Sequence, residues 1–413
     1  MTDPVAPHRH GKPTPLMLHL GQAAGSLQNA VHLAPLAHDP RFPWHDSVAA
    51  LGAALDLPHP SEIAVAGAHR LSQMLDGIET WQRHPWRRPD AEPPVIWSDG
   101  ASRLLDYGQC AEATSPAGPP VLVIPSLINR AYILDLHADC SLLRSLAAQG
   151  YRPLLMDWGV PGEAEAGFTL EDYVSGRLRP ALAIARVLAG RPVPVVGYCM
   201  GGTIGAALAA NTPGDIRALV TIGAPWDFSQ MIWTANTMAT PLRADRGMTA
   251  RHLLTVMAQT YGAIPDLLFQ YLFTLLDTGL AQRKFRRFAA LEPDSAEARH
   301  FVAVEDWLND PVHVPLGVAQ TVLVDWHLLN QTMTGDWSLL GRAVDLARVD
   351  MPVLSFCAPS DRIAPPASAE ALPRGIRGAD ILRPSSGHVG MVTGRRAATE
   401  LYAPLFSFLE GLT

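Results

Sequence analysis

The order of apolar and polar residues divides the chain into a helical first part and a later part in which strands and helices alternate. Helical spacing of apolar positions recurs at Leu18–Leu36 and Glu62–Trp81, and these segments lack the alternation typical of strands. Val95–Trp97 and Arg103–Tyr107 flank a Ser-Asp-Gly turn and predict an antiparallel hairpin at a sheet edge. From Pro119 onward, short apolar runs alternate with amphipathic segments. This order predicts an α/β domain on a mostly parallel sheet.

The alternating part contains a series of predicted strands and helices. The strands are Val121–Ile124, Arg152–Met156, Pro192–Val196, Ile216–Ile222, Val353–Phe356 and Asp380–Arg383. The helices are Ser141–Gln149, Thr169–Leu188, Gly201–Ala210, Pro366–Leu372 and Arg396–Glu410. Because parallel strands are buried on both faces, such continuous apolar runs are typical of them.

The rhythm is interrupted between residues 226 and 347, where apolar helices predominate and no strand is predicted. These helices are Leu253–Tyr261, Pro265–Leu276 and Val318–Met333. An insertion of this size predicts a helical cap over an active site. We therefore divide the chain into a helical N-terminal extension with a Pro-rich linker (1–92), an α/β core (93–225 and 348–413) and a helical cap insertion (226–347).

Composition and charge narrow the class of protein. The chain has 413 residues, 48% of them hydrophobic, with 32 Lys and Arg against 39 Asp and Glu, so its net charge of −7 argues against a nucleic-acid partner. Its four cysteines are widely spaced and form neither a disulfide framework nor a metal-ligand pattern. The N-terminus lacks an apolar secretory core, and no run reaches the roughly 18 apolar residues of a membrane span. We expect a protein of the reducing cytoplasm.

The stretch around Cys199 carries the first sign of chemistry. Gly197-Tyr198-Cys199-Met200-Gly201 lies between a β-branched strand and a small-residue helix, so it predicts a tight strand-to-helix turn with Cys199 at its apex. Flanking glycines let the backbone turn sharply and leave room for the helix to cross the strand. A sulfur at a helix N-terminus favours thiolate over thiol. The alternative is a buried structural cysteine at an ordinary turn.

Two further residues complete a candidate triad. Asp361 and His388 each follow a predicted strand, and the chain order Cys199, Asp361, His388 is that of the α/β-hydrolase triad. We predict His388 in the loop Ser385–Gly390. Alternatively, Asp361 caps the helix at Pro366 or forms a turn, and His388 is an ordinary core or surface histidine. Asp157 also follows a strand and is a rival acid, although it precedes the nucleophile in the chain.

The triad predicts nucleophilic catalysis on an acyl carbonyl. The His388 imidazole accepts the thiol proton, and Asp361 fixes the tautomer and stabilises the imidazolium. The oxyanion needs two backbone N–H donors, for which the candidates are the Met200 amide and that of either Leu127 or Ile128. A thioester keeps the acyl group activated, so a cysteine points towards acyl transfer as well as hydrolysis.

Several motifs in register resemble the polyhydroxyalkanoate synthase family. They are Val123-Ile124-Pro125-Ser126-Leu127-Ile128-Asn129-Arg130-Ala131-Tyr132-Ile133-Leu134-Asp135-Leu136, Asp157-Trp158-Gly159-Val160-Pro161, Leu170-Glu171-Asp172-Tyr173, Gly197-Tyr198-Cys199-Met200-Gly201-Gly202-Thr203, Trp226-Asp227-Phe228 and Gly387-His388. The resemblance runs from about Val121 to the C-terminus and is weakest in the cap.

The resemblance implies an α/β-hydrolase fold with a cap, no metal and no separate cofactor, since CoA is part of the substrate. It implies that 3-hydroxyacyl-CoA, of which 3-hydroxybutyryl-CoA is our first candidate, is polymerised at the surface of a polyester granule. Cys199 would carry the growing chain and His388 would deprotonate it, while Asp361 would assist His388 or activate the incoming 3-hydroxyl. A homodimer or a partner subunit is left open. The alternatives are an intracellular polyester depolymerase, an acyl-CoA thioesterase or a non-catalytic granule-binding protein.

Overall fold

The computed structural model describes residues 10–37, 39, 41–42, 44–45, 47, 49–54, 56–89, 92–231 and 239–412. The chain divides into two compact units: a helical unit of residues 1–87 and 270–309, and a sheet unit of residues 88–269 and 310–413. Residues 1–9 of the predicted extension, residues 90–91 of the predicted linker and residues 232–238 of the predicted cap lie outside the described residues.

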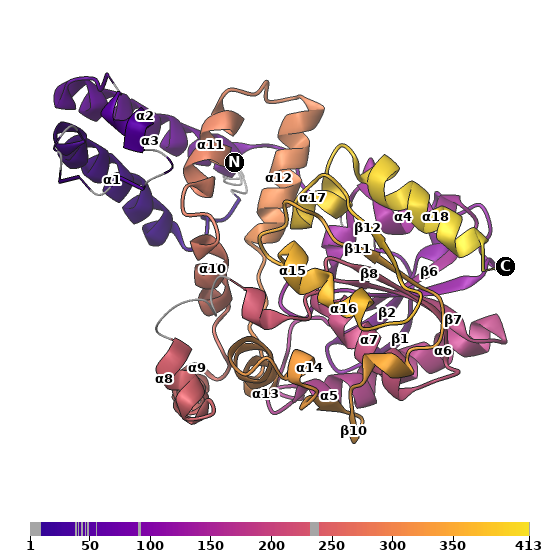
Figure 1. Cartoon of the computed structure of the whole chain (residues 1–413). Coiled ribbons are helices and arrows are strands. Elements are labelled where there is room, and N and C mark those ends of the chain that lie inside the picture. Colours follow the sequence, from indigo (N-terminus) through magenta and orange to yellow (C-terminus); the bar gives the residue numbers. More distant parts are fainter. Residues whose placement is uncertain are drawn as a thin grey trace, which may run out of the picture. The chain divides into compact units, whose positions relative to one another are not determined.

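The sheet unit is built on an eight-stranded sheet in the order β1-β2-β6-β3-β7-β8-β11-β12 (Figure 1). β2 is antiparallel to β1 and β6, and the strands from β6 to β12 pair in parallel. The strands are β1 (Val95–Asp99), β2 (Ser102–Asp106), β3 (Pro120–Ile124), β6 (Arg152–Asp157), β7 (Val193–Tyr198), β8 (Ile216–Ile222), β11 (Val353–Phe356) and β12 (Asp380–Leu382). The predicted hairpin and mostly parallel sheet are confirmed.

Helices cover both faces of this sheet. Figure 1 shows α4 and α18 on one side and α6 and α7 on the other. The helices of the sheet unit are α4 (Leu142–Ala148), α5 (Leu170–Tyr173), α6 (Arg179–Ala189), α7 (Met200–Asn211), α8 (Ala239–Ala244), α9 (Met248–Tyr261), α13 (Leu316–Ala319), α14 (Gln331–Thr334), α15 (Pro366–Ala369), α16 (Ala371–Arg374), α17 (His388–Thr393) and α18 (Ala403–Glu410), and α10 (Asp266–Leu275) crosses the unit boundary. Among the described helices, none is both long and apolar enough to cross a membrane.

Two of the predicted helices contain a π-helical segment that the sequence pattern did not indicate. The first is η4 (Val174–Leu178), between α5 and α6, and the second is η8 (Ala398–Tyr402), before α18. In both cases a proline, Pro180 or Pro404, occupies the second position of the α-helix that follows. Because proline has no N–H to donate, a wider turn before it accommodates the missing backbone hydrogen bond.

Residues 310–347 also contain a third π-helical segment and a short hairpin. The segment η6 (Gln320–Leu328) lies within the predicted helix at 318–333. Strands β9 (Ser338–Leu339) and β10 (Arg342–Ala343) pair antiparallel in a region where no strand was predicted. Two-residue strands are too short to leave an alternating pattern, which explains why this hairpin was missed.

The helical unit packs the N-terminal helices against two helices from the middle of the chain. Its helices are α1 (Leu16–Leu33), α2 (Ala49–Ala53), α3 (Pro60–Arg83), α11 (Leu280–Ala289) and α12 (Ala296–Leu308). Its core contains Met74, Trp81, Phe285 and Phe288. A Cβ on Gly77 would lie 2.0 Å from the Phe285 carbonyl oxygen, so the close contact of α3 and α11 requires glycine there.

Candidate active site

Cys199 sits at the apex of the turn between β7 and α7. Its backbone has φ 55° and ψ −128°, a combination that L-residues rarely adopt and that costs on the order of 1–3 kcal/mol. The turn is held because the Cys199 amide donates to the carbonyl oxygen of Ile222 at 2.8 Å, which links it to the end of β8. The strained turn therefore presents the Cys199 side chain at the carboxyl edge of the parallel strands.

Glycines around Cys199 are required by close approach. A Cβ on Gly197 would lie 2.4 Å from the Gly202 Cα, and one on Gly201 would lie 2.1 Å from the Ile124 carbonyl oxygen. Neither residue has a positive φ, so the sharp turn is made by Cys199 itself. The structure agrees with the prediction that glycines leave room for the helix and corrects the prediction that they make the turn.

Asp361 and His388 form a buried pair near the same edge. The His388 Nδ1 lies 2.7 Å from the Asp361 Oδ2, and the two residues are 7% and 3% exposed. The other carboxylate oxygen, Oδ1, accepts hydrogen bonds from the amides of Ile363 and Ala364, each at 2.8 Å. Asp361 therefore forms a turn and also orients a histidine. His388 is the first residue of α17 and not part of a loop as predicted.

The charges around His388 link it to Cys199 as well as to Asp361. Burial disfavours the imidazolium, but electrostatic interaction with Asp361 and Cys199 outweighs burial and raises the pKa of His388 well above its ordinary value of 6.5. Side-chain hydrogen bonds to both partners act in the same direction. The Tyr198 ring packs beside the imidazole, with 5.2 Å between the ring centroids. The structure thus brings together the three residues predicted from the sequence.

The rival acid Asp157 has other partners. Its Oδ2 accepts from the Arg103 guanidinium at 2.6 Å, and its Oδ1 accepts from the Gly159 amide at 3.1 Å. Arg103 belongs to β2, which pairs with β6. Asp157 therefore joins two strands, and Asp361 is the carboxylate that binds His388.

The loop after β3 lies against the start of α7 and holds the remaining oxyanion candidates. Its Pro125 carbonyl oxygen would be 2.7 Å from a Cβ on Gly201. The Ile128 amide donates to the Ser126 Oγ at 3.2 Å. Within the part of the chain that the structure describes, the Leu127 amide has no acceptor, and Met200, as the first residue of α7, has none within its own helix.

The other three cysteines lack this environment. All four cysteines of the chain are free thiols. Burial raises the pKa of Cys140 to about 11 and that of Cys357 to about 12, and burial also raises the pKa of Cys110. Because the thiolate is the reactive form, these residues fit the structural role predicted for them.

Comparison with known proteins identifies relatives. Residues 119–394 match the family model described as "alpha/beta hydrolase fold". A poly(3-hydroxyalkanoate) polymerase subunit PhaC from Synechocystis is 31% identical over 62% of this chain and 68% of its own length. The PhaC proteins of Haloferax mediterranei and Thiocystis violacea are each 27% identical, over 75% and 76% of this chain and 61% and 87% of their own lengths.

A solved structure of a monoglyceride lipase from Saccharomyces cerevisiae is 13% identical, with a TM-score of 0.49, and the match covers 80% of this chain and 98% of the lipase chain. The chain spans 61% of the length of the Haloferax relative and 87% of the length of the Thiocystis relative. The family model covers more than half of the chain and identifies the fold family. The Synechocystis relative, at 31% identity over 68% of its own length, identifies the narrower family of polymerase subunits. The chain belongs to the α/β-hydrolase fold family and, within it, to the family of poly(3-hydroxyalkanoate) polymerase subunits.

Proposed function

We propose that this chain is an acyltransferase that polymerises 3-hydroxyacyl groups from CoA thioesters into a polyester and releases CoA. The observation that carries the proposal is a cysteine at the apex of a strained turn, coupled to the buried pair of His388 and Asp361. The relatives named as polymerases support the choice of substrate. 3-Hydroxybutyryl-CoA is the first substrate to test.

In the first half-reaction, Cys199 takes the acyl group from CoA. With Nδ1–H donated to Asp361, the Nε2 of His388 is the base that takes the thiol proton. The Cys199 sulfur then attacks the thioester carbonyl carbon, and the carbonyl oxygen becomes an oxyanion. When the oxyanion collapses, the bond from the acyl carbon to the CoA sulfur breaks, and the departing thiolate takes the proton from Nε2.

Two backbone amides are assigned to the oxyanion. Among the residues that the structure describes, the amides of Leu127 and Met200 have no acceptor, which supports this pair over Ile128, whose amide already donates to Ser126. Preorganised N–H donors of this kind contribute roughly 3–4 kcal/mol each to stabilisation of the transition state.

In the second half-reaction, a 3-hydroxyl group receives the acyl chain. His388 takes the hydroxyl proton, the hydroxyl oxygen attacks the acyl carbon, and the bond to the Cys199 sulfur breaks as an ester forms; His388 then returns the proton to the sulfur. Both oxygens of Asp361 are occupied within the protein, and the residue is 3% exposed. This supports Asp361 as the residue that orients His388, and disfavours it as a base for the hydroxyl.

These steps account for every proton and bond without a resident metal or redox group, because CoA enters as part of the substrate and leaves as product.

We propose that the protein works in the cytoplasm at the surface of its polyester granule. The chain's own residues supply the nucleophile, base and orienting acid. A homodimer or a second subunit would then affect rate or granule contact and not the chemistry itself.

The proposal is tested by incubating purified protein with 3-hydroxybutyryl-CoA while following free CoA and the fate of the acyl group. We expect CoA release with insoluble polyester, lost in Cys199→Ala and retained in Cys110→Ala, the matched cysteine control. CoA release with only free 3-hydroxybutyrate would assign a thioesterase, and breakdown of added polyester would assign a depolymerase. No turnover by the wild type would overturn the enzyme assignment.

A further inference from the structure

Asp135 is a buried carboxylate at the end of the loop that contains Leu127. The loop leaves β3 at Ile124, passes through the short helix η3 (Ala131–Leu134) and reaches Asp135, the first residue of β4 (Asp135–His137). Asp135 is only 2% exposed. An isolated carboxylate would be costly at such a depth, so its partners determine whether it is stable there.

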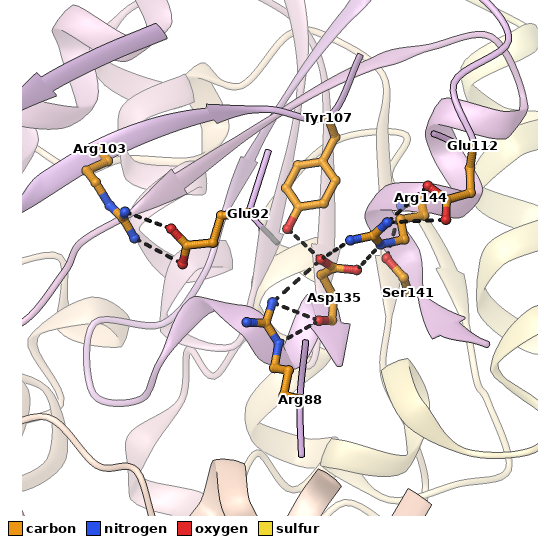
Figure 2. A network of polar contacts seen from close by, with 8 residues as sticks. All are labelled: Arg88, Glu92, Arg103, Tyr107, Glu112, Asp135, Ser141 and Arg144. Atoms are coloured by element: carbon orange, nitrogen blue, oxygen red, sulfur yellow. Dashed lines mark hydrogen bonds and ion pairs between the residues drawn. The ribbon is translucent and has the colours of Figure 1, made fainter. Parts of the chain in front are cut away.

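Three side chains converge on Asp135, and two of them, Tyr107 and Arg88, come from distant parts of the sequence (Figure 2). The Tyr107 hydroxyl donates to Oδ2 at 2.9 Å, and the Arg144 Nε donates to Oδ1 at 2.8 Å. Arg88 reaches both parts of the same residue, because its Nε and Nη2 each donate to the Asp135 carbonyl oxygen at 3.4 Å and its Nη2 lies 3.6 Å from Oδ2. Both the backbone and the side chain of Asp135 are therefore held.

The neighbours of these partners extend the network. The Arg88 guanidinium lies over the Tyr132 ring, 4.7 Å from its centroid, within η3. Arg144 also donates to Glu112 at 3.1 Å, and its own amide is bound by Ser141, which caps α4. Burial raises the pKa of Asp135, but hydrogen bonds and charge from Arg144, with Ser141 and Tyr107, outweigh burial and lower the pKa overall. Asp135 is therefore an anion at neutral pH.

The loop that Asp135 anchors touches the candidate active site at two places. The Ile124 carbonyl oxygen and the Pro125 carbonyl oxygen lie against Gly201 in the first turn of α7. The helix η3 packs against α17, which begins at His388. The loop is held by β3 at its start, by Asp135 at its end, and between them by the β-bridge of Asn129 with Pro311 and the ion pair of Arg130 with Asp310. The Leu127 amide lies between β3 and these contacts.

We propose that Asp135 is a positioning residue for acyl transfer, since its carboxylate, held by Tyr107, Arg88 and Arg144, fixes the loop that presents the Leu127 amide to the oxyanion. This inference rests on the proposed function. Movement of a donor by about 1 Å can cost on the order of 10²-fold in rate, so each anchor of this loop, Asp135 among them, contributes to how well the donor is placed.

The test compares a reaction that forms an oxyanion with one that does not. In Asp135→Asn, we expect kcat for CoA release from 3-hydroxybutyryl-CoA to fall about 10- to 100-fold, with KM within about threefold of wild type. Alkylation of Cys199 by iodoacetamide forms a bond from sulfur to carbon and expels iodide without any carbonyl oxyanion. We expect its rate to change less than about twofold, because Cys199 and His388 keep their geometry.

Asp106→Asn is the matched control. Asp106, the last residue of β2, is 1% exposed and forms a similarly buried pair with Arg152, the first residue of β6, whose Nη2 lies 2.6 Å from its Oδ2. We expect this variant to keep kcat within about threefold at a temperature where urea unfolding shows both variants to be folded.

An unchanged kcat in Asp135→Asn would overturn the inference. So would a parallel fall in kcat and alkylation rate, or an equal fall in Asp106→Asn, since both outcomes indicate general loss of structure. The wild type tests the proposed function separately. If it releases CoA with only free acid, the polymerase proposal fails while the Asp135 comparison stands, because thioester hydrolysis passes through the same oxyanion. A wild type without any turnover overturns both.

Discussion

Gly201→Ala should separate the nucleophile turn from the loop that faces it. The new Cβ would lie 2.1 Å from the Ile124 carbonyl oxygen and 2.7 Å from both the Ile124 carbonyl carbon and the Pro125 carbonyl oxygen. These are backbone atoms at the end of β3 and the start of the loop, so no side chain can rotate away. α7 and the loop must part by about 1 Å before the contact becomes tolerable.

The expected cost follows from this contact. Overpacking of this kind costs about 1–3 kcal/mol, and the better helix propensity of alanine returns at most about 1 kcal/mol. We therefore expect the free energy of unfolding to fall by about 1–2 kcal/mol. Because the loop carries the Leu127 amide, a displacement of about 1 Å should also lower kcat for CoA release on the order of 10²-fold.

Gly205→Ala is the matched substitution in the same helix. Its Cβ would meet only side-chain atoms at ordinary distances, the nearest being the Leu219 Cδ1 at 3.4 Å. We expect it to stabilise the protein by about 0.5–1 kcal/mol and to leave kcat unchanged. Urea unfolding and CoA release are measured for both variants. Equal stability or equal activity of Gly201→Ala and Gly205→Ala would refute the role assigned to the close contact.

Two further predictions concern titratable groups. Asp361→Asn should lower kcat by about 10³-fold or more and should also lower the pKa of His388. The pKa is measured by NMR from the imidazole resonances of His388 as the pH is changed. An unchanged titration would contradict the pairing of His388 with Asp361. Burial lowers the pKa of His327 to about 4 from 6.5, so the unfolded chain binds a proton between these values that the folded chain does not. The free energy of unfolding should therefore fall as the pH decreases from 6.5 to 4, and His327 should contribute about 3 kcal/mol of this fall. Urea unfolding at both pH values should show a smaller fall in His327→Gln. An equal fall in the variant and the wild type would contradict the lowered pKa of His327.

Much of the sheet could be predicted because its strands are short, apolar and continuous. Ile216–Ile222 and Val353–Phe356 were placed at the residues where β8 and β11 lie. Such strands are buried on both faces by their neighbours, so each residue in them is constrained and the pattern is unambiguous. The positions of Cys199, Asp361 and His388 followed from the same cause, since each comes directly after one of these strands or after the next turn.

The missed features depend on contacts between residues far apart in the chain. Residues 270–309 show the same helical spacing as the rest of the predicted cap, and only their packing against α3 groups them with the N-terminal helices. The partners of Asp135 come from three separate segments of the chain and share no local motif. A buried carboxylate looks like any loop aspartate in a sequence until its arginine partners are placed in space.

The two halves of the candidate site differ in how firmly they are held. The nucleophile side is constrained throughout. Every residue of α7 is buried, the Cys199 amide donates a hydrogen bond to the end of β8, and the Thr203 hydroxyl donates to the Pro225 carbonyl oxygen at 2.7 Å. The proposed oxyanion side is a loop held at separate points, by β3, by the bridge of Asn129 with Pro311 and by Asp135. Substitutions around this loop should therefore slow acyl transfer while leaving the intrinsic reactivity of Cys199 intact, whereas substitutions beneath α7 should change both together.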